Sequence, residues 1–342
     1  MAGKPVVLGK HSPLNYPVFI YRKERMHYRQ LGKTDLIVSR LSFGASPLGN
    51  VFDDVTESES IRAVHAAIDH GINFFDVAPF YGDTLAETRL GKALKNKRDS
   101  VFLATKCCRY GNGVFDFSYE RVLRSINESL ERLQVDYVDV LTVHDIEFGD
   151  RQQVLAEAVP AAFKVKEMGK ARYVGFSGLP VRYLAQIARE VTVDTVLSWG
   201  HYTLLEDEIN DELVPLSEEK GFGLMNAAPL MQRILSDAPV PPWQSSPQAV
   251  KDMQPKLLAL CREYGLALSD VALTYAVQHP VIATTIVGMS EQRQVEQNCR
   301  AIQIAVPEEL LGRIETLVAP VKNQMWFDGK PENNLPKIER SI

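Results

Sequence analysis

The chain alternates short apolar runs with longer segments whose apolar residues recur every three or four positions. The clearest longer segment follows Thr56 and is predicted to be a helix, because one face carries Ile61, Val64 and Ile68. Thr56 and Glu59 are expected to form a capping box at its start, and Gly71 to stop it at its end. The same periodicity predicts a helix over Tyr119–Leu133.

Eight short apolar runs, separated by helical segments, are predicted to be β-strands. They span Leu41–Gly44, Ile72–Phe75, Val101–Thr105, Val138–Val143, Tyr173–Phe176, Val193–Leu197, Phe222–Met225 and Ala283–Val287. Strands that alternate with helices indicate a parallel sheet, and eight such units in about 290 residues are typical of a (β/α)8 TIM barrel. A doubly wound sheet is the competing α/β fold. The barrel is favoured because no strand leads into Gly-x-Gly-x-x-Gly; after Gly111 and Gly113 no third glycine follows.

The two ends of the chain depart from this repeat. Met26–Ser39 is predicted to be a β-hairpin that turns at Gly32–Asp35. Residues 1–25 are interpreted as an N-terminal extension rather than a targeting signal, because they contain no apolar run of signal-peptide length. No linker-like change in composition interrupts the rest. Residues 26–328 are therefore expected to form a single barrel domain, followed by a C-terminal tail at 329–342.

Composition narrows the classes of protein. Hydrophobic residues make up 45% of the 342, enough for a large core. The 38 basic and 43 acidic residues include no basic cluster, so nucleic-acid binding is not expected. The longest uncharged run, Val271–Ser290, has Gln278, His279 and Pro280 at its centre and is interpreted as helix, turn and strand rather than a membrane span.

The chain has four cysteines and no Cys-x-x-Cys pair, which favours neither a disulfide scaffold nor a thiolate metal site. Together with the absence of a signal peptide, this predicts a cytoplasmic protein. The adjacent Cys107 and Cys108 are interpreted as packing residues rather than a redox pair.

Residues at the carboxyl ends of barrel strands face the active site in folds of this kind. Four reactive side chains occupy such positions, with about one β/α unit between successive strands: Asp76, Tyr81, Lys106 and His144. Each alone has a non-catalytic interpretation: a helix cap, a rim aromatic, a solvated charge and a buried core histidine, respectively. Their joint occurrence at strand ends favours one shared catalytic site.

The combination has a chemical logic. A free tyrosine titrates near pKa 10, too high for a proton-transfer group at neutral pH. A lysine ammonium beside the phenol of Tyr81 would stabilise the phenolate, and a carboxylate beside Lys106 would keep that lysine charged when buried. A histidine can then orient the substrate oxygen or relay its proton.

Three segments resemble signature motifs of the aldo-keto reductase superfamily. They read GINFFDVAPFYG at 71–82, LQVDYVDVLTVH at 133–144 and MGKARYVGFS at 168–177. The resemblance covers about residues 26–328. It implies a (β/α)8 barrel, a nicotinamide cofactor bound without a Rossmann motif, and a catalytic tetrad formed by Asp76, Tyr81, Lys106 and His144.

Within the superfamily, the chain is similar to the L-galactose dehydrogenase group. The similarity rests on FGASPLG at 43–49, HDIEFG at 144–149, SGLP at 177–180 and PVKNQMW at 320–326. It implies oxidation of the anomeric carbon of an L-galactose- or L-fucose-like aldose to the lactone, with NAD as cofactor and Tyr81 as general base. Two alternatives remain open: an NADPH-dependent aldehyde or ketone reductase, and a non-catalytic regulatory protein similar to potassium-channel β-subunits.

The resemblance also assigns residues to the cofactor: Ala45, Ser177, Ser198, Pro229, Leu230, Gly288, Ser290, Gln294 and Asn298. Three positions depart from the common pattern. Ala227 replaces a tyrosine that stacks on the nicotinamide in many members, Gly178 replaces an asparagine, and Ser198 replaces a glutamine. Placement of the nicotinamide must therefore rest on different contacts.

The segment after the last strand bears on the choice between NAD and NADP. NADP-using members commonly place basic residues where this chain has Gly288 and Gln294, while Glu291 and Glu296 would repel a 2′-phosphate. Arg293 is the one nearby cation. NAD is therefore expected in preference to NADP. Sugar contacts are expected from the loops after the strands, although each candidate could equally be a solvated or capping residue: Arg109, Asp145, Trp199 and His201.

Overall fold

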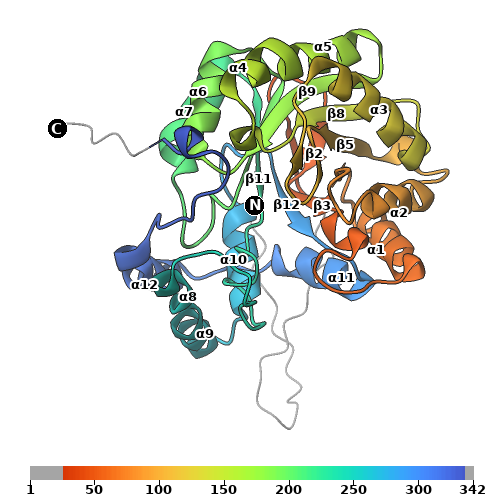
Figure 1. Cartoon of the computed structure of the whole chain (residues 1–342). Helices are drawn as coiled ribbons and strands as arrows, with labels where there is room; N and C mark the ends of the chain where they lie inside the picture. Colours follow the sequence, from red (N-terminus) through yellow and green to blue (C-terminus); the bar gives the residue numbers. More distant parts are fainter. Residues whose placement is uncertain (1–25, 336–342) are drawn as a thin grey trace, which may run out of the picture.

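The computed structural model describes residues 26–335, and its centre is a closed barrel of eight parallel strands, as predicted (Figure 1). The strands follow one another around the barrel in chain order, and β12 pairs with β3 to close it. The barrel strands are β3 (Leu41–Gly44), β4 (Phe74–Asp76), β5 (Phe102–Cys107), β8 (Val138–Val143), β9 (Ala171–Gly178), β10 (Thr195–Trp199), β11 (Gly223–Ala227) and β12 (Thr284–Gly288).

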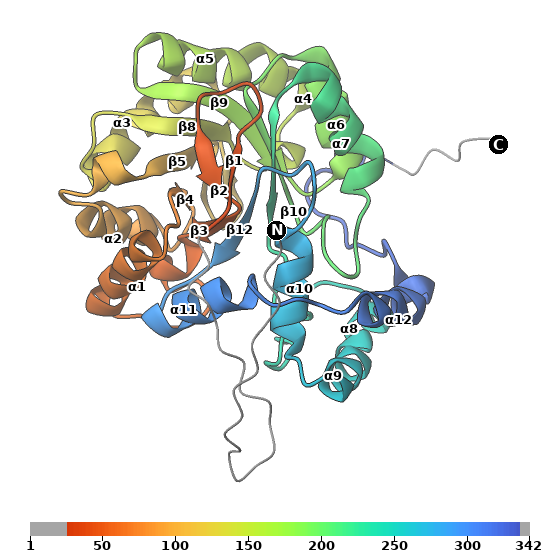
Figure 2. The ribbon, with the colours of Figure 1, turned by 180° about the vertical axis from the view of Figure 1, so that it is seen from behind.

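Helices surround the barrel, one after each strand (Figure 2). The surrounding helices are α1 (Glu57–Asp69), α2 (Leu85–Ala93), α3 (Tyr119–Leu133), α5 (Val159–Glu167), α6 (Val181–Glu190), α7 (Ile209–Lys220), α10 (Leu268–Val277) and α11 (Gln292–Ala301). The remaining helices are α4 (Arg151–Gln153), α8 (Gln248–Lys251), α9 (Met253–Glu263) and α12 (Glu308–Val318). Outside the ring, α9 and α12 pack on α10 around a second apolar cluster.

The predicted helices agree closely with the structure. Tyr119–Leu133 is α3 without a shift in either end. The hydroxyl of Thr56 accepts a hydrogen bond from the Glu59 amide, so half of the expected capping box forms at the start of α1. The other half of the box was predicted wrongly, because the Glu59 carboxylate does not bind the Thr56 amide. It accepts from Arg62 and from the Gln292 amide at the start of α11. A tertiary contact therefore takes the place of the local one.

All eight predicted barrel strands form, but most of them continue beyond their predicted carboxyl ends. Strand β10 runs to Trp199 instead of Leu197, and β11 runs to Ala227 instead of Met225. Strands β4 and β5 likewise continue into Asp76 and Lys106. The apolar signal stops where polar residues begin, whereas the backbone hydrogen bonds continue through them.

A short hairpin covers the amino end of the barrel. Strands β1 (Tyr28–Gln30) and β2 (Ile37–Ser39) pair antiparallel, which confirms the predicted hairpin. Leu31, Leu36 and Val38 are fully buried with the barrel's interior side chains. Gly32 has a positive φ of 58°, and a Cβ there would collide with the backbone of Phe222 and Gly223. The turn therefore requires glycine to reach the barrel floor.

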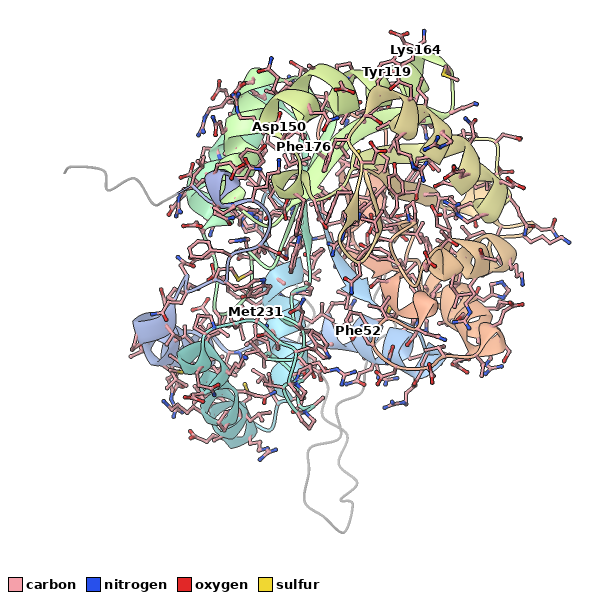
Figure 3. The ribbon with its side chains drawn as sticks, viewed as in Figure 1. Phe52, Tyr119, Asp150, Lys164, Phe176 and Met231 are labelled. Carbon is pink, nitrogen blue, oxygen red and sulfur yellow. The ribbon has the colours of Figure 1, made fainter. Side chains whose placement is uncertain are left out.

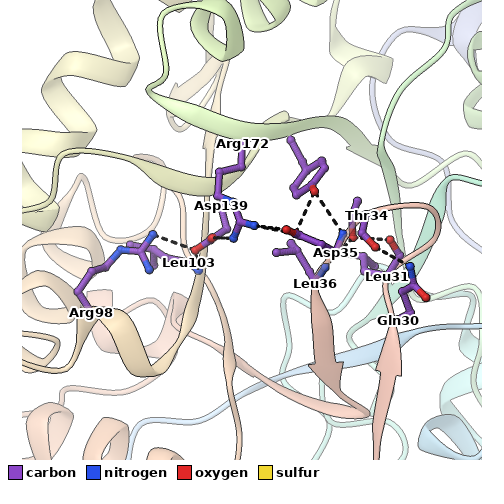
Figure 4. Close-up of polar contacts among 10 residues, drawn as sticks. Gln30, Leu31, Thr34, Asp35, Leu36, Arg98, Leu103, Asp139 and Arg172 are labelled. Carbon is purple, nitrogen blue, oxygen red and sulfur yellow. Dashed lines mark hydrogen bonds and ion pairs between the residues drawn. The ribbon is translucent and has the colours of Figure 1, made fainter.

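A buried carboxylate ties this hairpin to the barrel (Figure 4). Asp139 of β8 accepts from Arg98 and from the Leu103 amide through one oxygen, both at 2.8 Å, and from Arg172 through the other at 2.7 Å. Arg172 also binds Asp35 of the hairpin turn. The network links four segments that are distant in sequence.

The remaining sequence predictions concern the uncharged run at 271–290 and the two ends of the chain. The uncharged run at 271–290 forms part of α10, a turn and β12, as predicted. Among residues 26–335, no helix has the length and apolar character that a membrane crossing requires. Residues 1–25, the predicted extension, lie outside the described residues. Residues 329–335, placed beyond the predicted domain boundary, pack on the barrel: the Lys330 amide donates to the Glu147 carbonyl at 2.9 Å.

Candidate active site

The four residues of the predicted tetrad meet at the carboxyl end of the barrel. Asp76 ends β4, Lys106 lies near the end of β5, and His144 follows β8, while Tyr81 comes from the turn after β4. Lys106 is almost completely buried; its ammonium forms an ion pair with Asp76 and donates to the Val77 carbonyl at 3.0 Å. Strands β4, β5 and β8 are consecutive neighbours, which explains how distant sequence positions converge.

Tyr81 and His144 both face this ammonium. The Nζ of Lys106 lies 5.0 Å from the centroid of the Tyr81 ring, close enough for its charge to stabilise the phenolate. The Tyr81 and His144 rings meet edge to face, with centroids 5.9 Å apart and planes at 87°. Tyrosine hydroxyl, lysine ammonium and imidazole therefore form one cluster that can exchange a proton with a small molecule at the mouth.

Burial changes the electrostatics from what the sequence predicts. Burial lowers the pKa of Lys106, but Asp76 and Tyr81 outweigh it, so the net pKa is raised and the ammonium form is favoured. The pKa of Tyr81, by contrast, is raised above 10, because burial outweighs the lowering by Lys106. Lys106 does lower the pKa of Tyr81, as predicted, but in the unliganded protein burial has the larger effect. The pKa of His144 falls well below its usual value through burial and the charges of Lys106 and Arg109.

Arg109 and Asp145, two predicted sugar contacts, lie next to this cluster and form an ion pair with each other. Asp145 also lies 3.5 Å from Nε2 of His144. Arg109 belongs to a short hairpin after β5, made of β6 (Arg109–Gly111) and β7 (Val114–Phe115). Its guanidinium stacks over the ring of Phe80 at 3.7 Å. The pair thus presents both charges beside His144.

The other two predicted sugar contacts have different surroundings. Trp199, at the end of β10, is half-buried and packs on Trp326, with ring centroids 5.6 Å apart. His201 is only 3% exposed, and its Nδ1 lies 3.7 Å from the Glu206 carboxylate. Burial, with a contribution from Arg182, lowers the pKa of His201 to about 3. Trp199 therefore joins the rim of the mouth, whereas His201 is enclosed.

The residues assigned to the cofactor fall into two groups. Ser177 lies at the end of β9, where its hydroxyl accepts from the Asp145 amide at 3.4 Å. At the other side, Ser290 precedes α11 and donates through its amide to Oε1 of Gln294 at 2.9 Å. Gly288 is exposed, whereas Ala45, Ser198 and Pro229 are buried. Leu230 and Asn298 are half-buried.

Two loops meet beside the second group. The loops after β3 and β11 flank β12 and are marked by Phe52 and Met231 in Figure 3. Phe52 stacks on Trp243, with ring centroids 6.0 Å apart, and Asp53 pairs with Arg233 at 2.6 Å. The two flanking loops are therefore joined across the end of β12 and the start of α11.

Buried polar atoms at this end of the barrel have capacity for a ligand. Among residues 26–335, Nδ1 of His144, Oε2 of Glu147, Oγ of Ser198 and Oδ1 of Asn226 have no hydrogen-bond partner. Because unpaired buried polar groups are costly, such a set indicates that a polar molecule completes it. The donor and acceptor mixture fits the carboxamide and ribose hydroxyls of a nicotinamide nucleotide.

Sequence reasoning did not single out Phe80, Glu147, Asn226 or Trp326. Phe80 and Glu147 lie inside motifs used for the family resemblance, so their positions were visible although their roles were not. The local sequence contains no distinct signal for Glu147, because Asp145 and Asp150 place other acidic residues in the same short segment.

A barrel with this tetrad at its carboxyl end defines a class of oxidoreductases that act on carbonyl and alcohol groups. Residues 40–319 match the aldo/keto reductase family, and the chain belongs to that family. Its members use nicotinamide cofactors.

The chain is similar to several enzymes of this family. It is 41% identical to L-galactose dehydrogenase of Arabidopsis thaliana, over 90% of this chain and 99% of the relative. It is 29% identical to D-threo-aldose 1-dehydrogenase of a Pseudomonas species, over 80% of this chain and 92% of the relative. The holo form of the aldo-keto reductase AKR11C1 from Bacillus halodurans superimposes with a TM-score of 0.75 at 28% identity, covering 91% of this chain and all of that chain.

Proposed function

We propose that the protein oxidises the anomeric carbon of an aldose, L-galactose or an L-fucose-like sugar, to the corresponding lactone with NAD. The observation that carries this proposal is the cluster of Tyr81, Lys106 and His144 beside the Arg109–Asp145 pair. The 41% identity to L-galactose dehydrogenase supports the choice of substrate class.

Each residue then has a distinct task. Tyr81, as phenolate, takes the proton from the anomeric hydroxyl, while Lys106 stabilises the phenolate and Asp76 holds Lys106. His144 is neutral and orients the sugar oxygen. Arg109 and Asp145 bind ring hydroxyls, and Trp199 offers an aromatic platform. A nicotinamide, when bound, would supply the hydride acceptor for C1, so that the sugar loses one hydride and one proton in total.

The surroundings of α11 support NAD over NADP. Gln294 carries no charge and is tied to Ser290, while Glu59 places a carboxylate at the Gln292 amide. Of the nearby cations, Arg293 is exposed and lies 3.4 Å from Glu291, and Arg62 is paired with Glu59. A dianionic 2′-phosphate would therefore meet carboxylates and cations that are already paired with them.

The experiment is a panel of aldoses assayed with the purified protein in the presence of NAD or NADP, with NADH or NADPH formation as readout. We expect turnover of L-galactose or L-fucose and a kcat/KM ratio that favours NAD. A preference for NADP with aldehydes or ketones would instead indicate a carbonyl reductase. The chain is also 29% identical to a probable potassium-channel β-subunit of Arabidopsis thaliana, and a non-catalytic role of that kind predicts no turnover with any sugar.

A further inference from the structure

Position 178 lacks the side chain that many family members place after the serine of this strand. Gly178 ends β9, and a Cβ built on it would lie well within van der Waals contact distance of Oε2 of Glu147. Glu147 comes from a different element, the short 3-10 helix Ile146–Phe148 that follows β8. Its carboxyl group therefore fills the space that a side chain at 178 would occupy, and this contact explains why the residue is glycine.

The Glu147 carboxyl group is half engaged. Its Oε1 accepts from the Leu179 amide at 3.0 Å, which fixes the direction of the group. Its Oε2 is buried and has no hydrogen-bond partner among residues 26–335. Glu147 itself is completely buried in the unliganded structure. A buried carboxyl oxygen without a partner is costly unless a ligand supplies one.

Two more unpaired atoms continue from this point along the sheet. In the strand register, Gly178 is opposite Ser198 of β10, and Ser198 is opposite Asn226 of β11. In-register neighbours of a parallel sheet project to the same side. Ser198 and Asn226 are both completely buried, and Oγ of Ser198 and Oδ1 of Asn226 lack partners in the described part of the chain. The Asn226 amide is held by the Tyr202 carbonyl at 3.1 Å, which leaves its Oδ1 free.

We propose that Glu147 replaces the missing side chain at 178 and, together with Ser198 and Asn226, binds the carboxamide of the nicotinamide ring. This inference rests on the proposed use of a nicotinamide cofactor. It also accounts for the two departures at 178 and 198: the polar atoms for the carboxamide come from a neighbouring loop and from β11 instead.

The protonation of Glu147 fits this role. Burial, followed by the negative charge of Asp145, raises the pKa of Glu147 well above its usual value. Because Oε1 is held by the Leu179 amide, a neutral acid would carry its proton on Oε2 and could donate it to the carboxamide oxygen, while Ser198 and Asn226 accept from the carboxamide nitrogen. Burial also raises the pKa of Asp145, but its ion pair with Arg109 opposes that rise, and Glu147 has no such partner.

The test compares binding of NAD with binding of ADP-ribose, which has no nicotinamide, by calorimetry or fluorescence quenching. In Glu147→Ala we expect affinity for NAD to fall roughly tenfold, the loss of one buried hydrogen bond, with affinity for ADP-ribose unchanged. If the wild type prefers NADP, the pair becomes NADP and 2′-phospho-ADP-ribose. Equal losses for both ligands, or no loss for either, would overturn the inference.

Two further variants separate a ligand contact from a general loosening of the loop. Asn333→Ala removes hydrogen bonds to the carbonyls of Glu147 and Gly149 but leaves Oε2 in place, so its two affinities should change equally or not at all. In the double variant Glu147→Ala, Gly178→Asn, the asparagine can enter the vacated space after Leu184 yields slightly. We expect it to recover selectivity for NAD over ADP-ribose, and failure to recover it argues against the shared position.

Failure of this inference and failure of the proposed function give different results. If the wild-type protein binds neither dinucleotide, the proposed function fails and no comparison of variants arises. If the wild type binds and oxidises sugars while Glu147→Ala discriminates between NAD and ADP-ribose no differently from wild type, only the inference about Glu147 fails.

Discussion

The two ends of the barrel use buried polar groups in opposite ways. At the amino end, Asp139 is 1% exposed and both of its carboxylate oxygens are occupied, by Arg98, Arg172 and the Leu103 amide (Figure 4). At the carboxyl end, Glu147 is equally buried but uses only one carboxyl oxygen, and neighbouring side chains on β10 and β11 have unpaired atoms.

The difference separates structural polarity from ligand-binding polarity. Unpaired atoms also occur at the amino end, at Nε of Arg40 and of Arg98, but other nitrogens of both guanidiniums are hydrogen-bonded. The hydroxyl of Thr195, also at the amino end, is unpaired as well. Unfilled hydrogen bonds at the carboxyl end lower stability unless something binds. The carboxyl end also carries buried ion pairs, Lys106 with Asp76 and Arg109 with Asp145, so the unpaired groups beside them are what distinguishes the end where a ligand can bind.

Tyr81→Phe should produce the largest effect and should act on activity alone. The change removes one hydroxyl, so the general base is lost while the ring still packs on His144. We expect sugar oxidation to fall by about 10²- to 10⁴-fold, with circular dichroism and NAD affinity nearly unchanged. Retention of more than a few per cent of the wild-type rate would show that another group is the base.

Asp139→Ala should produce the converse, a loss of stability without a loss of chemistry. The substitution leaves Arg98 and Arg172 without their shared partner, and both guanidiniums are partly buried. We expect the free energy of unfolding to fall by about 3 kcal/mol in urea titrations, with kcat unchanged where the variant is folded. Asp136→Ala, an exposed aspartate nearby, is the matched control and should change stability by less than about 0.5 kcal/mol. A fall in kcat would mean that the two ends are coupled.

The pH dependence tests the electrostatics of the carboxyl end. The pKa of Tyr81 is raised above 10, so the phenolate fraction grows about tenfold for each pH unit below that value. We expect kcat/KM for the sugar to rise from pH 6 to 9 without a break near 6.5, because the pKa of His144 lies well below that value. Single-turnover rates should show the same slope, which excludes product release as its origin. A flat profile in both measurements argues against phenolate as the base.

The sequence placed every barrel strand to within two residues at each end, and the errors at the carboxyl ends all cut the strand short. Strands β3 and β8 are located without error because their polar residues, Ser42, Asp139 and Thr142, lie inside the strand and not at its end. Strands β4, β5 and β10 continue through Asp76, Lys106 and Ser198, where the apolar pattern has stopped. Residues that line a site replace the apolar residues that make a strand recognisable. The strand ends beside the site are therefore predicted too short.

The candidate site was likewise predictable from the sequence only in part. The tetrad was predictable because its members follow strands at a regular spacing and lie in family motifs. The space shared by Glu147 and Gly178 was not, since it depends on the approach of two loops whose residues are 31 positions apart. The net direction of the Tyr81 pKa was also out of reach, because it depends on a balance between burial and the Lys106 charge that only the packed structure sets.

Asp35→Asn should have the smallest effect and shows where the amino-end network stops contributing. Asp35 binds Arg172 through both carboxylate oxygens, at 2.6 and 2.8 Å, and accepts from the Tyr173 hydroxyl. The geometry is favourable, but the Asp35 side chain is 67% exposed, so water and salt screen the pair. Asparagine keeps one acceptor oxygen, and Arg172 keeps its bond to Asp139. We expect a loss of at most about 1 kcal/mol in urea titrations, and less in 1 M salt. A loss near that expected for Asp139→Ala would mean that the hairpin turn is part of the buried network rather than an exposed extension of it.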